Sequence, residues 1–188
     1  MNFFIRQIAS QKNAGFSLVE LMIVIGILGI LSVISIPALI NPEHKARKAA
    51  RELVGDMQQT RMSAIKENQN WAIVFVPANT TYLICSDPGP DGVWSATADN
   101  TIKKTVRFTD YAAGIQYGNG TAATNATIGG GAFPANFVSY TADVLTFNPR
   151  GTCAAGYVYL FYGDASYAVG TLSTGIVRVK RWTGGAWR

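Results

Sequence analysis

The stretch that decides the fold is Gly15–Glu20, with the sequence GFSLVE, together with the nearly unbroken apolar run that follows it to Ile36. Glu20 therefore places a carboxylate at the head of a segment that otherwise has the composition of a membrane-spanning helix. A charge in hydrocarbon costs about 2.5–3.5 kcal/mol on insertion scales. A carboxylate retained at that cost indicates a functional residue, so Glu20 is the first candidate.

The residues before this stretch form a short basic leader. It contains Arg6 and Lys12 and no acidic residue. A secretory signal peptide has its cleavage site after the apolar region, whereas here the small-residue junction lies before it, between Gly15 and Phe16. Cleavage there removes residues 1–15 and leaves the apolar segment on the mature chain.

This combination resembles the prepilin signature of type IV pilins and type II secretion pseudopilins. The matching residues are Gly15 before the cut, Phe16 as the new N-terminus, Glu20, and Pro37 near the end of the apolar run. The resemblance implies cleavage by a prepilin peptidase, N-methylation of Phe16, and filament assembly in which Glu20 pairs with the N-terminal amine of a neighbouring subunit. The alternative is a plain signal anchor whose Glu20 reaches the membrane interface.

The first part of the mature chain is predicted to be one long helix in two segments. Residues 16–36 form the apolar transmembrane helix, because a segment of that length reaches about 30 Å. Pro37 and Pro42 each remove a helical hydrogen bond, so we expect a kink or a short break between Ile36 and Glu43.

Residues 37–69 are predicted to continue the helix in amphipathic form. Small and apolar residues recur there at spacings of three, four and seven, which is typical of a helix with one face packed on a domain; they are Ala46, Ala50, Leu53, Met57 and Ala64. The basic residues Lys45, Arg47, Lys48 and Arg51 are interpreted as a solvated face or as a contact with lipid headgroups.

Residues 70–188 are predicted to form a β-rich globular domain. After Trp71 the hydrophobic period changes to two, with Gly, Pro, Asn and Asp between the runs. The predicted strands are 71–76, 82–85, 103–108, 137–140, 144–147, 157–162, 167–169 and 176–182. The fold class is therefore α+β, a long N-terminal helix followed by an antiparallel β-sandwich-like domain with two sheets face to face.

Three segments of the body resemble the GspH/FimT/FimU branch of minor pilins and pseudopilins: 50–65, 145–151 and 174–181. The resemblance implies a minor filament subunit at or near the tip, with other pilin or pseudopilin subunits and the prepilin peptidase as partners. It also implies a single pass through the bacterial inner membrane with the body in the periplasm, followed by a periplasmic or extracellular filament. Pilus and pseudopilus are not distinguished.

The two cysteines are Cys85 and Cys153. The leader and the helix orientation place the body outside the cytoplasm, where disulfides persist, so one bridge between them is predicted. The alternative is two separate buried thiols.

Motifs for catalysis are absent from the sequence. His44 is the only histidine, no Cys and His residues have metal-ligand spacing, and no glycine-rich loop opens a helix to bind phosphate. A structural protein without a cofactor or metal site is therefore predicted. The loop that contains Asp87, Asp91 and Asp99 leaves calcium binding as a minor alternative.

The C-terminal strand is the best candidate for a binding surface. Strand alternation puts Arg178 and Lys180 on one face and Arg181 on the other, and Arg188 ends the chain. These four cations predict a possible DNA-binding site, in which basic side chains contact phosphates, and DNA uptake is the alternative function. The other interpretation is an edge strand kept soluble by positive charge. The net charge of +5 includes Arg6 and Lys12 of the leader, and the remaining charge of about +3 is too small to indicate nucleic-acid binding by itself.

Overall fold

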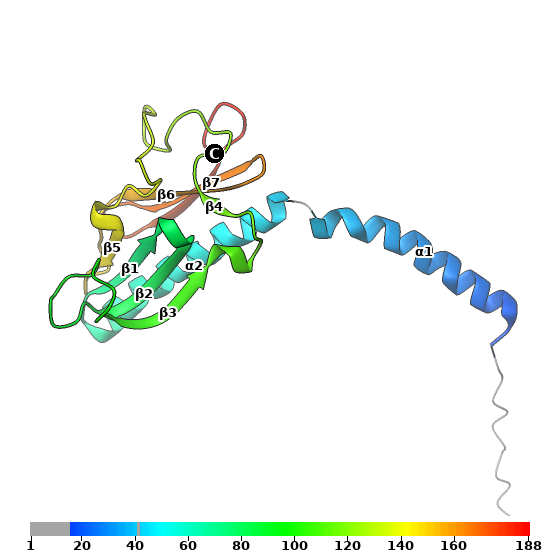
Figure 1. Cartoon of the computed structure of the whole chain (residues 1–188), viewed down its shortest axis with the longest axis horizontal. Coiled ribbons are helices and arrows are strands. Elements are labelled where there is room, and N and C mark those ends of the chain that lie inside the picture. The colour runs from blue at the N-terminus through cyan, green and yellow to red at the C-terminus, as the bar shows by residue number, and fades with distance from the viewer. Residues whose placement is uncertain (1–15, 41) are drawn as a thin grey trace, which may run out of the picture. The chain divides into compact units, whose positions relative to one another are not determined.

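A computed structural model describes residues 16–40 and 42–188. The chain divides into two units, Met1–Ile40 and Asn41–Arg188, and Figure 1 shows the helix of the first and the sheets of the second. The predicted leader 1–15, including Gly15, lies outside the described residues. Within those residues, no helix combines the length and the apolar character that crossing a membrane requires.

The first unit contains helix α1, Leu18–Ile40, and the second begins with helix α2, Pro42–Glu67. Helix α1 continues through Pro37, so the predicted end at Ile36 is too early. Pro42 is the first residue of α2, a position where proline is favoured because its missing N–H would have no helical partner. Residue 41, inside the predicted break between Ile36 and Glu43, lies outside the described residues, so the break stays a prediction.

Helix α2 buries one face in the body. The predicted small and apolar positions are at most 1% exposed; they are Ala46, Ala50, Leu53, Met57 and Ala64. Asp56 lies on the buried face as well. Helix α2 therefore has one buried face, and that face carries one charge.

The body has two antiparallel four-stranded sheets. Sheet A has the order β3-β2-β1-β5 and sheet B the order β4-β6-β7-β8. Their bounds are β1 Trp71–Val76, β2 Thr81–Asp87, β3 Thr101–Arg107, β4 Gln116–Tyr117, β5 Val144–Phe147, β6 Gly156–Tyr162, β7 Ala165–Thr171 and β8 Val177–Arg181. Short 3₁₀ turns occupy Pro77–Asn79, Phe108–Asp110 and Thr141–Asp143.

Helix α2 contacts both sheets, through β1 and β5 of sheet A and through β6, β7 and β8 of sheet B. The hydrophobic core is therefore lined by the helix and the two sheets together, and not by two sheets facing each other alone. Tyr140 also joins the sheets: its ring stacks on Phe75 of β1 at 5.8 Å, and its hydroxyl donates to the Gly156 carbonyl oxygen of β6 at 3.0 Å.

One predicted strand is wrong, and one observed strand was not predicted. The run 137–140 is not a strand, because Phe137 has a φ of 63° and Val138 makes only an isolated bridge to Val158. A left-handed residue cannot continue an extended strand. The two-residue strand β4 was not predicted, since two residues are too few to show a period.

The predicted disulfide is also wrong, because both thiols are free. Cys85 is fully buried in β2 of sheet A, opposite Ala72 of β1. Cys153 lies beside sheet B, where its Sγ donates to the Leu172 carbonyl oxygen at 3.4 Å. Burial raises the pKa of both thiols.

A guanidinium fixes the second half of α2 to two turns of the body. Nε of Arg61 donates to the Gly151 carbonyl oxygen at 2.8 Å, and its terminal nitrogen donates to the Thr174 carbonyl oxygen at 3.4 Å. The backbones of these turns nearly touch: a Cβ built on Gly175 would lie 1.9 Å from the Gly151 oxygen. Gly175 is therefore required for the close approach.

Candidate functional site

The predicted assembly residues lie at the start of α1. Phe16 precedes the helix and is 80% exposed. Glu20 is exposed in the first helical turn, where the helix dipole favours a negative charge. The structure thus presents Phe16 and the carboxylate of Glu20 at one end of α1, while the predicted cleavage partner Gly15 lies outside the described residues.

The side chains of α1 do not form a core. Its large apolar residues between Leu18 and Leu31 are 45–74% exposed, and they occur all round the helix. A contiguous apolar surface of this kind indicates contact with lipid or with other protein chains.

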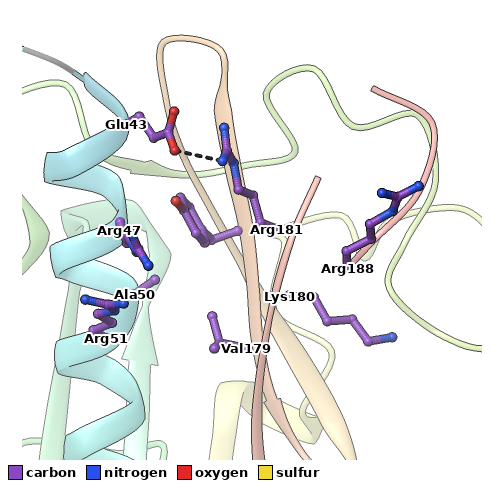
Figure 2. Close-up of a pocket in the computed structure, with 9 residues that line it drawn as sticks. Glu43, Arg47, Ala50, Arg51, Val179, Lys180, Arg181 and Arg188 are labelled. Carbon is purple, nitrogen blue, oxygen red and sulfur yellow. Dashed lines mark ion pairs between the residues drawn. The ribbon is translucent and has the colours of Figure 1, made fainter. Parts of the chain in front are cut away.

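A basic pocket lies between α2 and β8 in the body, with a volume of about 270 Å³. Figure 2 shows the residues of both elements that line it. The lining comprises Glu43, Arg47, Ala50, Arg51, Tyr167, Val179, Lys180, Arg181 and Arg188. Five of these nine residues are cationic and one is anionic. The side chains of Lys180 and Arg188 extend away from α2 (Figure 2), so Arg47, Arg51 and Arg181 supply the positive charge beside the helix.

Local periodicity explains how the pocket forms. Arg47 and Arg51 are four residues apart on α2, so they lie one turn apart on the same helix face. On β8, the guanidinium of Arg181 points toward α2 and forms a 2.7 Å ion pair with Glu43 (Figure 2). Tyr167 of β7 is the register partner of Arg181.

The pKa of the Tyr167 hydroxyl is affected by the charged residues around the pocket. Burial raises the pKa of its hydroxyl, and Arg181, Arg47 and Arg51 oppose that rise. Three guanidinium groups therefore act on one phenol. Among the described residues, the Tyr167 hydroxyl makes no hydrogen bond, so it is available to a ligand.

The structure separates the four cations that were predicted to bind DNA. Lys180 lies on the other face of β8, where its Nζ donates to the Ala126 carbonyl oxygen at 2.8 Å and stands 5.3 Å from the centre of the Tyr157 ring. Alternation places Arg178 on that face too. Arg188 pairs with Arg181 through the backbone, and Figure 2 shows its side chain and that of Lys180 extending away from α2. Lys180, Arg181 and Arg188 all line the basic pocket, but their charged ends do not point the same way.

The sequence interpretation missed the contribution of α2 to this pocket. Arg47 and Arg51 were interpreted as a solvated face or a lipid contact, and Tyr167 as an ordinary strand residue. The i, i+4 spacing of the two arginines was visible in the sequence. Their approach to β8 was not, because it depends on the packing of elements more than a hundred residues apart.

In the loop that contains Asp87, Asp91 and Asp99, two carboxylates accept hydrogen bonds from backbone amides of the same loop. Asp87 accepts a hydrogen bond from the Gly89 amide at 2.8 Å, and Asp91 accepts one from the Val93 amide at 2.7 Å. In the part of the chain that the structure describes, no three His, Cys, Asp or Glu residues gather as metal ligands would. These aspartates therefore stabilise turns of their own loop.

Two family models match the chain. The Type II transport protein GspH model matches residues 49–175, and the Prokaryotic N-terminal methylation motif matches residues 10–36. The second match covers the whole segment in which the cleavage, methylation and assembly residues are predicted.

One curated relative is Prepilin peptidase-dependent protein D of Escherichia coli strain K12. It is 39% identical over 101 residues, which cover 49% of this chain and 56% of that protein. The chain therefore spans about half the length of this relative.

Two solved structures are similar in fold. The minor pseudopilin EpsH from the Type 2 Secretion System of Vibrio cholerae is 11% identical, with a TM-score of 0.48 over 72% of this chain and 95% of that one. The type IV minor pilin FimU of Pseudomonas aeruginosa is 14% identical, with a TM-score of 0.47 over 77% and 93%. Since the GspH model matches more than half of its residues, the chain belongs to the GspH family of type II transport proteins and carries the N-terminal methylation motif at its start.

Proposed function

We propose that this chain is a minor subunit of a type II secretion pseudopilus or a type IV pilus, with a structural role at or near the filament tip. The observation that carries the proposal is the exposed apolar surface of α1 with a single carboxylate, Glu20, at its head. Packing of this helix among the helices of other subunits would cover the apolar surface.

Glu20 has a defined role in this assembly. A carboxylate in an apolar layer is stable only when it is paired. The partner is the ammonium group of Phe16 on a neighbouring subunit, which exists only after cleavage between Gly15 and Phe16. Cleavage by the prepilin peptidase is thereby coupled to assembly, and methylation of Phe16 follows cleavage.

Before assembly, the precursor is anchored in the bacterial inner membrane through residues 16–36, with the body in the periplasm. The apolar sequence of that segment and the basic leader support this placement, together with the methylation motif. After assembly the chain belongs to a periplasmic or extracellular filament.

The test compares Glu20→Ala with the wild-type chain in cells that assemble the filament. We expect normal cleavage and an unchanged thermal unfolding of the body, but a large loss of incorporation into sheared filaments. Glu67→Ala, on the exposed C-terminal end of α2, removes the same charge from the body and should be incorporated normally. Normal incorporation of Glu20→Ala would contradict the proposed pairing.

Mass spectrometry of the mature chain tests the processing step. We expect a chain that begins at Phe16 and carries one added methyl group on its terminal amine. A chain that retains residues 1–15 in the filament would instead support a plain signal anchor.

A further inference from the structure

The first half of α2 carries its cations at the unfavourable end of the helix. Lys45, Arg47, Lys48 and Arg51 all lie within the first ten residues after Pro42. Lys45 lies in the first turn, where the helix dipole disfavours a cation, and like charges at i, i+4, such as Arg47 and Arg51, repel each other. Helix stability therefore does not explain this cluster.

Arg47 and Arg51 are also unpaired. Both are exposed, and among the described residues neither forms an ion pair or a hydrogen bond. Other cations of the body do have partners, since Lys104 pairs with Glu52 and Asp56 at 3.0 and 2.7 Å. The two unpaired guanidiniums are thus free to bind an external anion.

These two arginines border two hollows at once. Besides the basic pocket, a neighbouring hollow of about 310 Å³ is lined by His44, Arg47, Lys48, Arg51 and Glu52. The positive surface therefore continues from β8 across Arg47 and Arg51 to the next face of α2. A guanidinium offers a planar fork of donors that matches the oxygens of a phosphate.

We propose that the basic pocket binds the phosphate of an anionic phospholipid headgroup. Arg47 and Arg51 hold the phosphate oxygens, and the Tyr167 hydroxyl supplies a further donor. Arg181 adds positive charge from β8 while it remains paired with Glu43.

The position of the pocket in the chain favours a lipid as the source of the phosphate. Only residue 41 separates α1 from α2, so Arg47 follows the apolar segment closely along the chain. Basic residues that directly follow a membrane anchor lie within reach of charged headgroups. This argument rests on the proposed membrane-anchored precursor.

The consequence is a second contact with the membrane besides the anchor. While the precursor waits in the bilayer, the headgroup holds the α2–β8 side of the body against the lipid surface. Transfer of the chain into a filament removes it from the lipid and empties the pocket.

The experiment uses the full chain in nanodiscs made of phosphatidylcholine alone or with phosphatidylglycerol. Hydrogen exchange is followed on residues 43–51 and 177–181. We expect phosphatidylglycerol to slow exchange in both segments of the wild-type chain, and Arg47→Gln/Arg51→Gln to lose this effect. Lys103→Gln/Arg107→Gln removes the same charge from exposed positions on β3 and should retain it.

Other outcomes would overturn the proposal. Equal loss in the β3 variant would show diffuse attraction in place of a site. Protection by glycerol phosphate in phosphatidylcholine discs, equal to that by the lipid, would assign the pocket to soluble phosphate esters. Protection by a single-stranded oligonucleotide but not by phosphatidylglycerol would assign it to nucleic acid.

The design also separates this proposal from the membrane anchor. Insertion into both kinds of disc without any effect of phosphatidylglycerol would overturn the pocket assignment and leave the anchor standing. Failure to insert into either disc would count against the anchor and, with it, against the lipid as ligand.

Discussion

The hydroxyl of Tyr82 donates a 2.6 Å hydrogen bond to Oδ2 of Asp56, and both side chains are buried. Tyr82 belongs to β2 and Asp56 to α2, so this bond joins sheet A to the helix. Nζ of Lys104 on β3 completes the group, at 2.7 and 2.9 Å from the two carboxylate oxygens. The charge on the buried face of α2 is therefore paired and hydrogen-bonded, as a buried carboxylate must be.

Removal of the Tyr82 hydroxyl should destabilise the body. In Tyr82→Phe, Asp56 loses a buried hydrogen bond to a charged acceptor, which is worth about 1.5–3 kcal/mol. Thermal unfolding of the full chain in mild detergent, followed by near-ultraviolet circular dichroism, would measure the loss. Tyr162→Phe is the matched control, because among the described residues the Tyr162 hydroxyl makes no hydrogen bond. An equal melting temperature for the two variants would contradict the prediction.

Stability should fall at alkaline pH. Burial and the bond to Asp56 raise the pKa of Tyr82. Burial alone would lower the pKa of Lys104, but its hydrogen bonds to Asp56 and Glu52 outweigh that effect and raise it. The folded body therefore holds protons that the unfolded chain releases above about pH 10.

By linkage, the stabilisation from these two groups is fully present below that pH and is lost as the pH rises further. Melting temperatures measured from pH 8 to pH 11 should fall more steeply for the wild-type chain than for Tyr82→Phe. Parallel curves would show that Tyr82 ionises equally in both states.

A side chain at residue 175 should not be tolerated. Gly175 has a φ of 79°, and an added Cβ would lie 1.9 Å from the Gly151 carbonyl oxygen. The backbone conformation alone costs a non-glycine residue about 1–3 kcal/mol, and the clash would also displace the carbonyl that Arg61 binds. We expect Gly175→Ala to lower the melting temperature clearly, whereas Gly185→Ala, with nothing within 4 Å of its added Cβ, should be neutral.

Both thiols should be present in the purified protein. Alkylation after unfolding without a reductant should label Cys85 and Cys153, and reduction should leave the mass unchanged. In the folded chain alkylation should be slow, because burial raises the pKa of both thiols and so lowers the fraction of reactive thiolate. Labelling that requires prior reduction would restore the predicted bridge.

The spacing of apolar residues was sufficient to predict the helices and strands where their secondary structure is regular. The spacing of Ala46, Leu53 and Met57 identified the buried face of α2, and alternation located β1 and β5 with their observed bounds. The alternation of apolar residues wrongly predicted a strand at 137–140, because Phe137 has a left-handed backbone conformation. The sequence prediction also placed the helix end too early at Pro37, because a proline near a helix terminus removes only one hydrogen bond.

Long-range partners were not predictable from the sequence. An even number of cysteines suggested one bridge, yet both thiols are free: Cys85 is buried in β2, and Cys153 lies in the segment between β5 and β6. The buried partners of Asp56, which are Tyr82 and Lys104, are 26 and 48 residues away in the sequence, so no local pattern identified them.

The contacts of α2 are distributed along its length: Glu43 to Arg181, then Glu52 and Asp56 to Lys104, then Arg61 to Gly151. Tension applied to the chain at the start of α2 therefore loads these attachments in sequence. We expect the half-exposed pair at Glu43 to break first and the buried pair at Asp56 later. The first turns of the helix would then detach under load while the remainder still joins both sheets.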